Sequence, residues 1–262
     1  MELGIRGRRG LVTGASRGIG RGIARTLAAE GVNLALVARD VDALDALADE
    51  LASEFDIQCV GIAADLAQVT GIEHATREAE SGLGGIDMLI NNAGAIPAGT
   101  LDSVSDEDLV AAWDLKLLGY IRLARVLVGP MRERGWGRVI NVIGLAGKQP
   151  SAGYIWGGPA NAALMNFTKG LAQTVAGDGI RVNAINPGPI ATERWTTMLE
   201  VAAKRSGRPL DEIIKGAASS VPLGRVGEVD EIADLVAFLC SERAGFLHGA
   251  VIPMDGGMCA AL

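Results

Sequence analysis

Residues 10–31 read GLVTGASRGIGRGIARTLAAEG, and the glycines of this stretch decide the fold. A short apolar run at residues 10–13 leads into a glycine loop, and a helix-forming pattern follows it. Gly14 permits a tight turn, Gly18 lets a pyrophosphate approach the backbone, and Gly20 lets the helix and strand pack closely. A strand, a glycine loop and a helix in this order predict a dinucleotide-binding unit.

The rest of the chain alternates short apolar runs with longer helical patterns. Seven runs are predicted to be strands, at residues 10–13, 32–38, 58–63, 86–91, 138–142, 181–186 and 250–254. Runs such as LALVA are apolar without alternation, as expected when helices cover both faces of a parallel sheet. We predict an α/β fold over residues 1–262: a single doubly wound Rossmann domain with a seven-stranded parallel sheet flanked by helices.

Composition narrows the possible partners and compartments. The net charge of −7 provides no basic field for nucleic acid, so a small molecule is the expected partner. The three cysteines are far apart and lack CxxC spacing, which predicts free thiols and no metal site. The N-terminus has no apolar signal region, and no apolar run reaches membrane-spanning length. We therefore expect a cytoplasmic protein without a membrane partner.

One segment, residues 193–221, falls outside the alternation. Its charge, its glycine and proline interruptions and its pattern LDEIIKGAA suit a pair of short mobile helices that would form a substrate lid. The alternative is a rigid structural excursion.

Further motifs follow the later strands: Asp65, NNAG at residues 91–94, INPGPIAT at residues 185–192 and DGG at residues 255–257. Together with the GxxxGxG spacing of the first loop, they closely resemble the short-chain dehydrogenase/reductase family over nearly the whole chain. The resemblance implies a nicotinamide cofactor, with adenine, ribose and carboxamide contacts at strand ends. The residues assigned to cofactor binding are Gly14, Ser16, Arg17, Gly18, Ile19, Gly20, Arg39, Asp65, Leu66, Asn91, Ala93, Gly94, Pro187, Gly188, Ile190 and Thr192.

The second strand ends at Ala38, where NAD-preferring members of that family usually carry an acidic residue. Arg17 and Arg39 instead offer two guanidinium groups that can clamp a 2′-phosphate. We predict NADP(H) as the cofactor in preference to NAD(H), unless either arginine simply points to solvent.

The family's catalytic positions hold unusual residues here. Members usually use an asparagine, a serine and a YxxxK pair, with the tyrosine as general acid. Neighbouring residues place Lys116 at the asparagine position, Gly144 at the serine position, Gly157 at the tyrosine position and Asn161 at the lysine position. The resemblance therefore implies a divergent member in which lysine and asparagine have exchanged places.

Two further residues are candidates for the proton chemistry, beside Asn161. Lys116 interrupts an apolar helical stripe, which indicates either a functional buried ammonium or a head that reaches solvent or a subunit interface. Tyr154 lies three residues before Gly157 and can swing into the space that the glycine leaves, or else serves as a pocket wall.

The leading hypothesis is an oxidoreductase that transfers hydride between NADP(H) and a small carbonyl or alcohol through a rearranged site. The alternatives are a catalytically silent NADP(H)-binding sensor or scaffold, and a non-redox enzyme on the same fold. The resemblance also suggests a homotetramer or homodimer formed through the helices at residues 106–128 and 161–176, which are apolar over most of their circumference.

Overall fold

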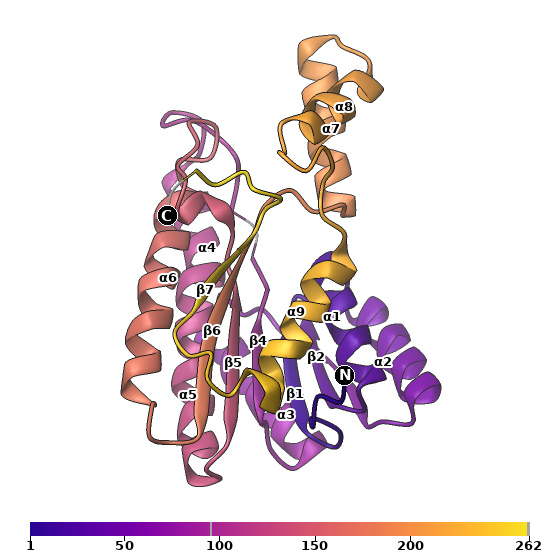
Figure 1. Ribbon diagram of the computed structural model, residues 1–262, viewed down its shortest axis with the longest axis vertical. Coiled ribbons are helices and arrows are strands. Elements are labelled where there is room, and N and C mark those ends of the chain that lie inside the picture. The colour runs from indigo at the N-terminus through magenta and orange to yellow at the C-terminus, as the bar shows by residue number, and fades with distance from the viewer. Residues whose placement is uncertain (95, 261–262) are drawn as a thin grey trace.

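The computed structural model describes residues 1–94 and 96–260, which form an α/β structure around one parallel sheet (Figure 1). The strand order is β3-β2-β1-β4-β5-β6-β7, and every neighbouring pair is parallel. The strands are β1 (Arg9–Thr13), β2 (Asn33–Ala38), β3 (Cys59–Ala63), β4 (Met88–Asn91), β5 (Gly137–Val142), β6 (Ile180–Pro187) and β7 (Val251–Met254). The predicted doubly wound class and all seven predicted strands are confirmed.

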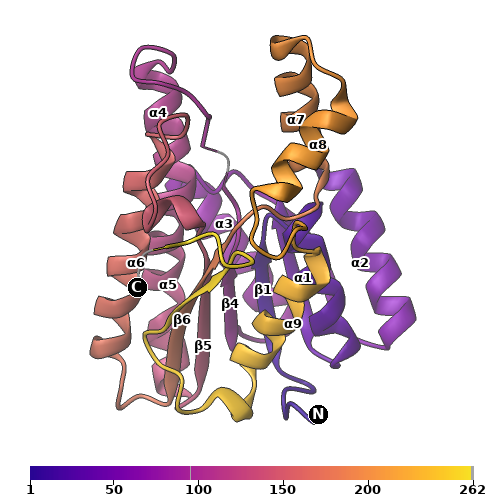
Figure 2. The same cartoon turned by 45° about the horizontal axis from the view of Figure 1, so that its top comes forward.

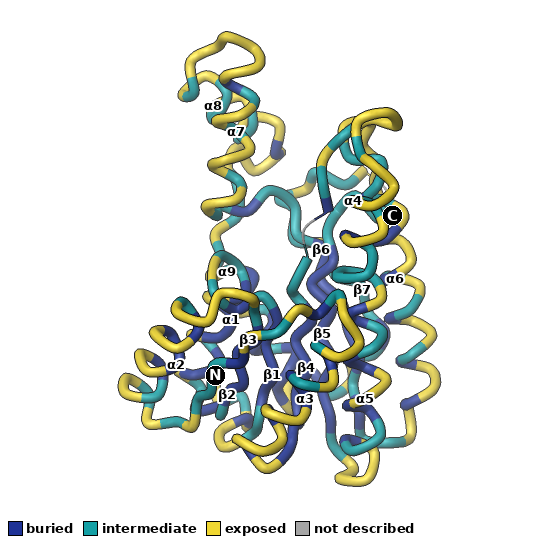
Figure 3. Tube along the Cα trace, turned by 180° about the vertical axis from the view of Figure 1, so that it is seen from behind, coloured by how far each residue is buried: buried dark blue, intermediate teal, exposed yellow. Residues whose placement is uncertain are grey.

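Helices cover both faces of the sheet because strand side chains alternate between the faces. One apolar cluster joins the sheet to α1, α2 and α9, and a second joins the opposite face to α3, α5 and α6. The strands accordingly form the buried centre of the molecule (Figure 3). The bounds of these helices are α1 (Gly18–Ala29), α2 (Val41–Phe55), α3 (Val69–Leu83), α5 (Gly119–Glu133), α6 (Gly157–Thr174) and α9 (Val229–Cys240).

Helix α4 (Asp106–Trp113) continues into α5 through a π-helical turn at Asp114–Leu118. Two short 3₁₀ turns, Leu145–Gly147 and Glu242–Ala244, complete the helical segments of the body. A π turn inserts one residue into the helical repeat and often occurs at functional sites.

The segment after β6 forms two helices, α7 (Glu193–Ser206) and α8 (Leu210–Ser219), as predicted for residues 193–221. Both helices project beyond the carboxyl ends of the strands (Figures 1 and 2). Ala203 is the buried residue of α7, and α8 has none. In the described part of the chain, no helix combines the length and the apolar character that crossing a bilayer requires.

The order of the strands reverses direction at β1, whose neighbours are β2 and β4. At such a point the loops that leave the carboxyl ends of adjacent strands diverge and open a crevice. The loops after β1, β4, β5 and β6 therefore meet at one edge of the sheet, where the candidate residues lie.

Candidate functional site

The glycine loop after β1 has the backbone that an anion site needs. Gly14 and Gly18 have φ values of +65° and +55°, a left-handed conformation that favours glycine. A Cβ at Gly20 would overlap the Gly14 carbonyl and lie 2.6 Å from Asn92 Nδ2. Helix α1 starts here without a side-chain cap and without an acidic residue in its first turn. Its free N–H groups and dipole therefore fit a pyrophosphate.

Arg17 and Arg39 follow β1 and β2, which are neighbours in the sheet. Both residues are exposed. Among residues 1–94 and 96–260, no hydrogen bond or ion pair holds either guanidinium group. Both groups are thus available for a phosphate beside the glycine loop.

A local hydrogen bond holds the turn after β3, and a long-range hydrogen bond ties the turn after β4 to β1. Asp65 Oδ1 accepts from Ala67 N at 3.1 Å, and Ala93 N donates to Thr13 Oγ1 at 3.0 Å. The side chain of Asn91 is fully buried and donates to Asn141 Oδ1 at 2.9 Å, while its own Oδ1 has no partner in the described structure. The side-chain nitrogen of Asn91 therefore binds a neighbouring strand, and its side-chain oxygen is the atom left without a partner in the described structure.

The segment after β6 lies across the edge of the sheet. Gly188 N donates to Met254 O at 2.9 Å, which ties the segment to β7. Thr192 caps α7 by accepting from Trp195 N at 3.2 Å, and its methyl group lies 3.6 Å from the position of a Cβ at Gly18. Thr192, one of the residues assigned to cofactor binding, therefore lies beside the glycine loop.

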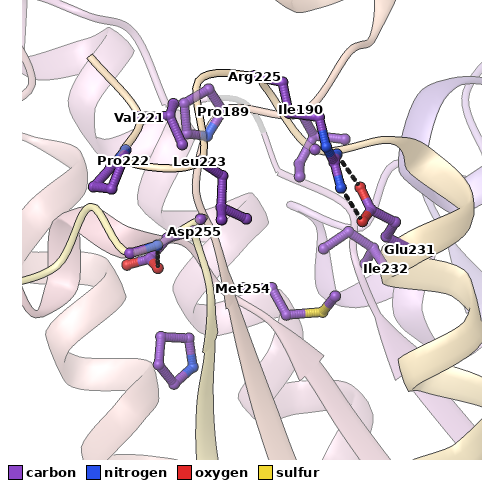
Figure 4. A pocket seen from close by; sticks show the side chains of 14 residues that line it. Pro189, Ile190, Val221, Pro222, Leu223, Arg225, Glu231, Ile232, Met254 and Asp255 are labelled. Carbon is purple, nitrogen blue, oxygen red and sulfur yellow. Dashed lines mark hydrogen bonds and ion pairs between the residues drawn. The ribbon is translucent and has the colours of Figure 1, made fainter. Parts of the chain in front are cut away.

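A cavity of about 520 Å³ adjoins this segment (Figure 4). Its lining is mostly apolar, and the ion pair between Arg225 and Glu231 bounds it on one side. Neither Lys116, Tyr154 nor Asn161 lines it. The cavity was not predicted, because its walls come from four separate segments: residues 189–190, 221–227, 231–232 and 253–257.

Lys116 lies in the π turn and points inward. Its Nζ donates to Ile143 O at 2.6 Å, at the carboxyl end of β5. Its stem passes over Gly94, where an added Cβ would lie 2.8 Å from Lys116 Cδ. Burial, with a smaller contribution from the charge of Arg194, lowers the pKa of Lys116 to about 8. The ammonium group is thus held inside the site, where its protonation can change near neutral pH.

Tyr120 lies one helical turn after Lys116, on the same apolar stripe. Its hydroxyl donates to Val142 O at 3.0 Å, and the side chain is buried. Burial raises the pKa of this phenol. Lys116 and Tyr120 therefore bind consecutive carbonyl groups at the end of β5.

Asn161 meets the same strand end from α6. It is buried, and its Nδ2 donates to Gly144 O at 3.4 Å. Gly144 has a φ of +136°, and a Cβ there would lie 3.0 Å from Asn161 Nδ2. The Asn161 Oδ1 atom has no partner within the described residues, and leaving a buried acceptor unpaired costs about 1–3 kcal/mol. A ligand hydroxyl is a fitting partner for this oxygen.

Tyr154 occupies the space beside Gly157. A Cβ added to Gly157 would overlap the Tyr154 ring at Cε1 and Cζ. Burial, the largest effect, raises the pKa of Tyr154, whereas the positive charge of Arg194 lowers it. The ring also packs against an apolar cluster formed by Ile96, Ala112 and Ala160. Tyr154 is therefore both a wall of the site and a phenol next to a cation.

Arg194 was missed by the sequence analysis. Its Nη1 donates to Gly94 O at 3.1 Å and its Nη2 to Ile96 O at 3.3 Å. A signal was present, since this arginine comes two residues after Thr192, at the start of the predicted lid. The family motif INPGPIAT ends at Thr192 and therefore does not include Arg194.

Comparison with known proteins agrees with this geometry. A family model described as enoyl-(acyl carrier protein) reductase matches residues 14–259. The NADPH-dependent reductase BacG of Bacillus subtilis is 34% identical over 95% of this chain and 97% of its own length. The 3-oxoacyl-[acyl-carrier-protein] reductase FabG of Aquifex aeolicus is 32% identical over 98% of this chain and 100% of its own length.

Among solved structures, L-sorbose reductase from Gluconobacter frateurii, complexed with NADPH and L-sorbose, has a TM-score of 0.95. It is 37% identical, and the match covers 100% of both chains. BacG and the L-sorbose reductase are both described with NADPH, in agreement with the predicted preference for NADP(H). With its parallel sheet, its glycine loop and these relatives, the chain belongs to the short-chain dehydrogenase/reductase family of oxidoreductases.

Proposed function

We propose that this protein is an NADPH-dependent reductase that transfers hydride to a small carbonyl compound, or from the corresponding alcohol, through a rearranged catalytic site. The observation that carries the proposal is the meeting of Lys116 and Asn161 at Ile143 and Gly144. Tyr154 completes the arrangement from the space beside Gly157.

The cofactor is held by the residues already described. The glycine loop takes the pyrophosphate, and Arg17 and Arg39 take the 2′-phosphate. Asn161 Oδ1, unpaired in the described structure, accepts a hydrogen bond from a ribose hydroxyl. When bound, NADPH supplies the hydride that forms the new C–H bond. Helices α7 and α8 form a lid that closes over the substrate, and the lid belongs to the same single domain as the cofactor site.

Tyr154 supplies the proton. As the carbonyl carbon gains hydride, its oxygen takes the phenolic proton of Tyr154 and becomes a hydroxyl, and the phenolate that remains is reprotonated from solvent. Lys116 is charged below about pH 8, and its ammonium group, which lies beside the end of β5, stabilises negative charge that develops in the site. Asn161 fills the place of the usual lysine without carrying its charge.

Stopped-flow mixing tests the proposal by following NADPH consumption with a panel of carbonyl compounds. The relatives suggest L-sorbose and a 3-oxoacyl thioester as the first two. We expect turnover with NADPH, tighter binding of NADPH than of NADH, and a loss of turnover in Tyr154→Phe. Tight NADPH binding without turnover across a broad panel would instead show a silent binding protein, and no binding of either dinucleotide would favour a non-redox enzyme.

The exchange of lysine and asparagine is tested by Lys116→Asn and Asn161→Lys, alone and combined. Because both side chains bind the Ile143–Gly144 turn, their effects on kcat should be strongly non-additive. Independent effects would contradict a shared catalytic role.

A further inference from the structure

Tyr154 lies just before α6, and the α6 position that carries a lysine in the usual family arrangement holds the uncharged Asn161 here. A buried phenol that gives up its proton leaves a negative charge in a poorly solvated site, which is costly without a cation. Three titratable or charged side chains face this site: Lys116 from the π turn, Tyr120 from α5 and Arg194 from α7. Arg194 is the cation that lowers the pKa of Tyr154, against the larger raising effect of burial, and its partner Ile96 belongs to the apolar cluster against which Tyr154 packs.

The guanidinium group of Arg194 is held in place by backbone carbonyls. Nη1 and Nη2 donate to Gly94 O and Ile96 O, which lie in the loop between β4 and α4. Carbonyl groups do not neutralise the positive charge, so it stays available to an anion. Arg194 bears no ion pair with a carboxylate among the described residues.

The same loop also positions the segment that carries Tyr154. Gly99 N donates to Gly153 O at 2.8 Å, and Gly99 and Tyr154 form an isolated parallel bridge. Trp156 Nε1 donates to Thr100 O at 3.2 Å. Arg194, at the start of α7, is thus connected to the segment of Tyr154 through the loop that contains residues 96–100.

We propose that Arg194 is the positioning residue of the acid: it holds the Tyr154 hydroxyl in place and pairs with the phenolate that forms when the proton passes to the substrate oxygen. This inference rests on the proposed function, in which Tyr154 is the proton donor. It assigns to α7 the charge that a lysine on α6 provides in the usual family arrangement. The O–H bond of Tyr154 breaks, the O–H bond of the product alcohol forms, and Arg194 itself exchanges no proton.

The composition of the chain permits a test that needs no substrate. The protein has two tyrosines, so fluorotyrosine labelling gives two fluorine resonances, and Tyr120→Phe assigns the one from Tyr154. The titration midpoint of Tyr154 is measured by fluorine NMR in the wild type, Arg194→Gln, Arg194→Lys and the control Arg205→Gln. Arg205 lies in the last turn of the same helix and is exposed. Circular dichroism at each pH confirms that the variants remain folded.

Removing a nearby positive charge destabilises the phenolate, so the Tyr154 midpoint in Arg194→Gln should rise by about one pH unit. Arg194→Lys should retain most of the wild-type value, and Arg205→Gln should match the wild type. An unchanged midpoint in Arg194→Gln overturns the inference. This result is independent of turnover, so it remains decisive even if no carbonyl substrate is found and the proposed function fails.

Kinetics then separate positioning from binding. In a reaction catalysed by the wild type, Arg194→Gln should lower kcat about tenfold, the effect of about 1.4 kcal/mol in the barrier, with little change in the Kd of NADPH. Arg194→Lys should restore a large part of kcat. A parallel loss of NADPH affinity in Arg194→Gln would assign the side chain to cofactor binding and contradict the inference.

Discussion

At the scale of single residues, Gly157 controls where Tyr154 can lie. The ring occupies the volume that any side chain at position 157 would need. We expect Gly157→Ala to displace the ring and lower kcat at least tenfold, while α6 persists because alanine favours helix by about 1 kcal/mol over glycine. Steady-state kinetics and a crystal structure of the variant check this. Gly170→Ala in the same helix is the control, since nothing lies within 4 Å of the added Cβ.

Lys116 should make the stability of the protein depend on alkaline pH. Its pKa is lowered from an ordinary 10.5 to about 8, so the unfolded chain binds this proton more tightly than the folded protein. The folded lysine loses its proton near pH 8, whereas the unfolded lysine keeps its proton up to about pH 10.5. Stability attributable to Lys116 should therefore rise with pH across this range. Urea unfolding of the wild type and Lys116→Met across this range gives the difference. A difference that stays constant with pH would show that the pKa is not lowered.

Some residues of the candidate site can be predicted from the sequence, and others cannot. Lys116 and Asn161 could be singled out because each stands out against a motif or a stripe, and the structure brings both to the Ile143–Gly144 turn. Arg194 is exposed and interrupts no motif or apolar stripe, so only its contacts with Gly94 O and Ile96 O distinguish it. Contacts between segments far apart in the chain leave no local pattern.

At the scale of elements, we expect the start of α1 to determine whether the cofactor binds. A Cβ at Gly20 would overlap the Gly14 carbonyl and crowd Asn92, so helix and loop could not keep their present approach. Gly20→Ala should weaken NADPH binding at least tenfold, measured by fluorescence titration. Gly129→Ala adds the same methyl group to α5 in open space and should bind NADPH normally. Normal binding by Gly20→Ala would mean that this close approach is not required.

The helix around Lys116 illustrates what periodicity can and cannot predict. A regular repeat of 100° per residue places Trp113, Lys116 and Tyr120 on one stripe, and the inward direction of that stripe is correct. The repeat gives no sign of the π turn at Asp114–Leu118. A π turn changes which backbone groups are hydrogen-bonded, and the residue types at 114–118 do not signal that change. The sequence pattern therefore could not reveal it.

At the scale of the whole molecule, apolar periodicity was sufficient to predict the seven parallel strands and the segment that contains α7 and α8. Long-range strand order follows from the few arrangements that right-handed βαβ connections allow. The cavity beside Ile190 could not be foreseen in this way, because its walls are distant in sequence.

The outer faces of α5 and α6 should associate with another copy of the chain. Leu118 and Val126 are exposed large apolar side chains on this side of the molecule, at 39% and 40% of their full areas. We expect a homodimer or homotetramer by native mass spectrometry, and Val126→Glu should shift it toward smaller species because a charge is costly to bury. Arg125→Glu, a change at the neighbouring exposed position, controls for charge alone. A monomeric wild type would contradict this expectation.

The overlap between Tyr154 and the empty side of Gly157 also constrains how such a site can evolve. A tyrosine at position 157 and the present placement of the Tyr154 ring cannot coexist, since both need one volume. Restoring a tyrosine at position 157 would therefore require the Tyr154 ring to leave its present place, so the two positions are not independent targets for substitution.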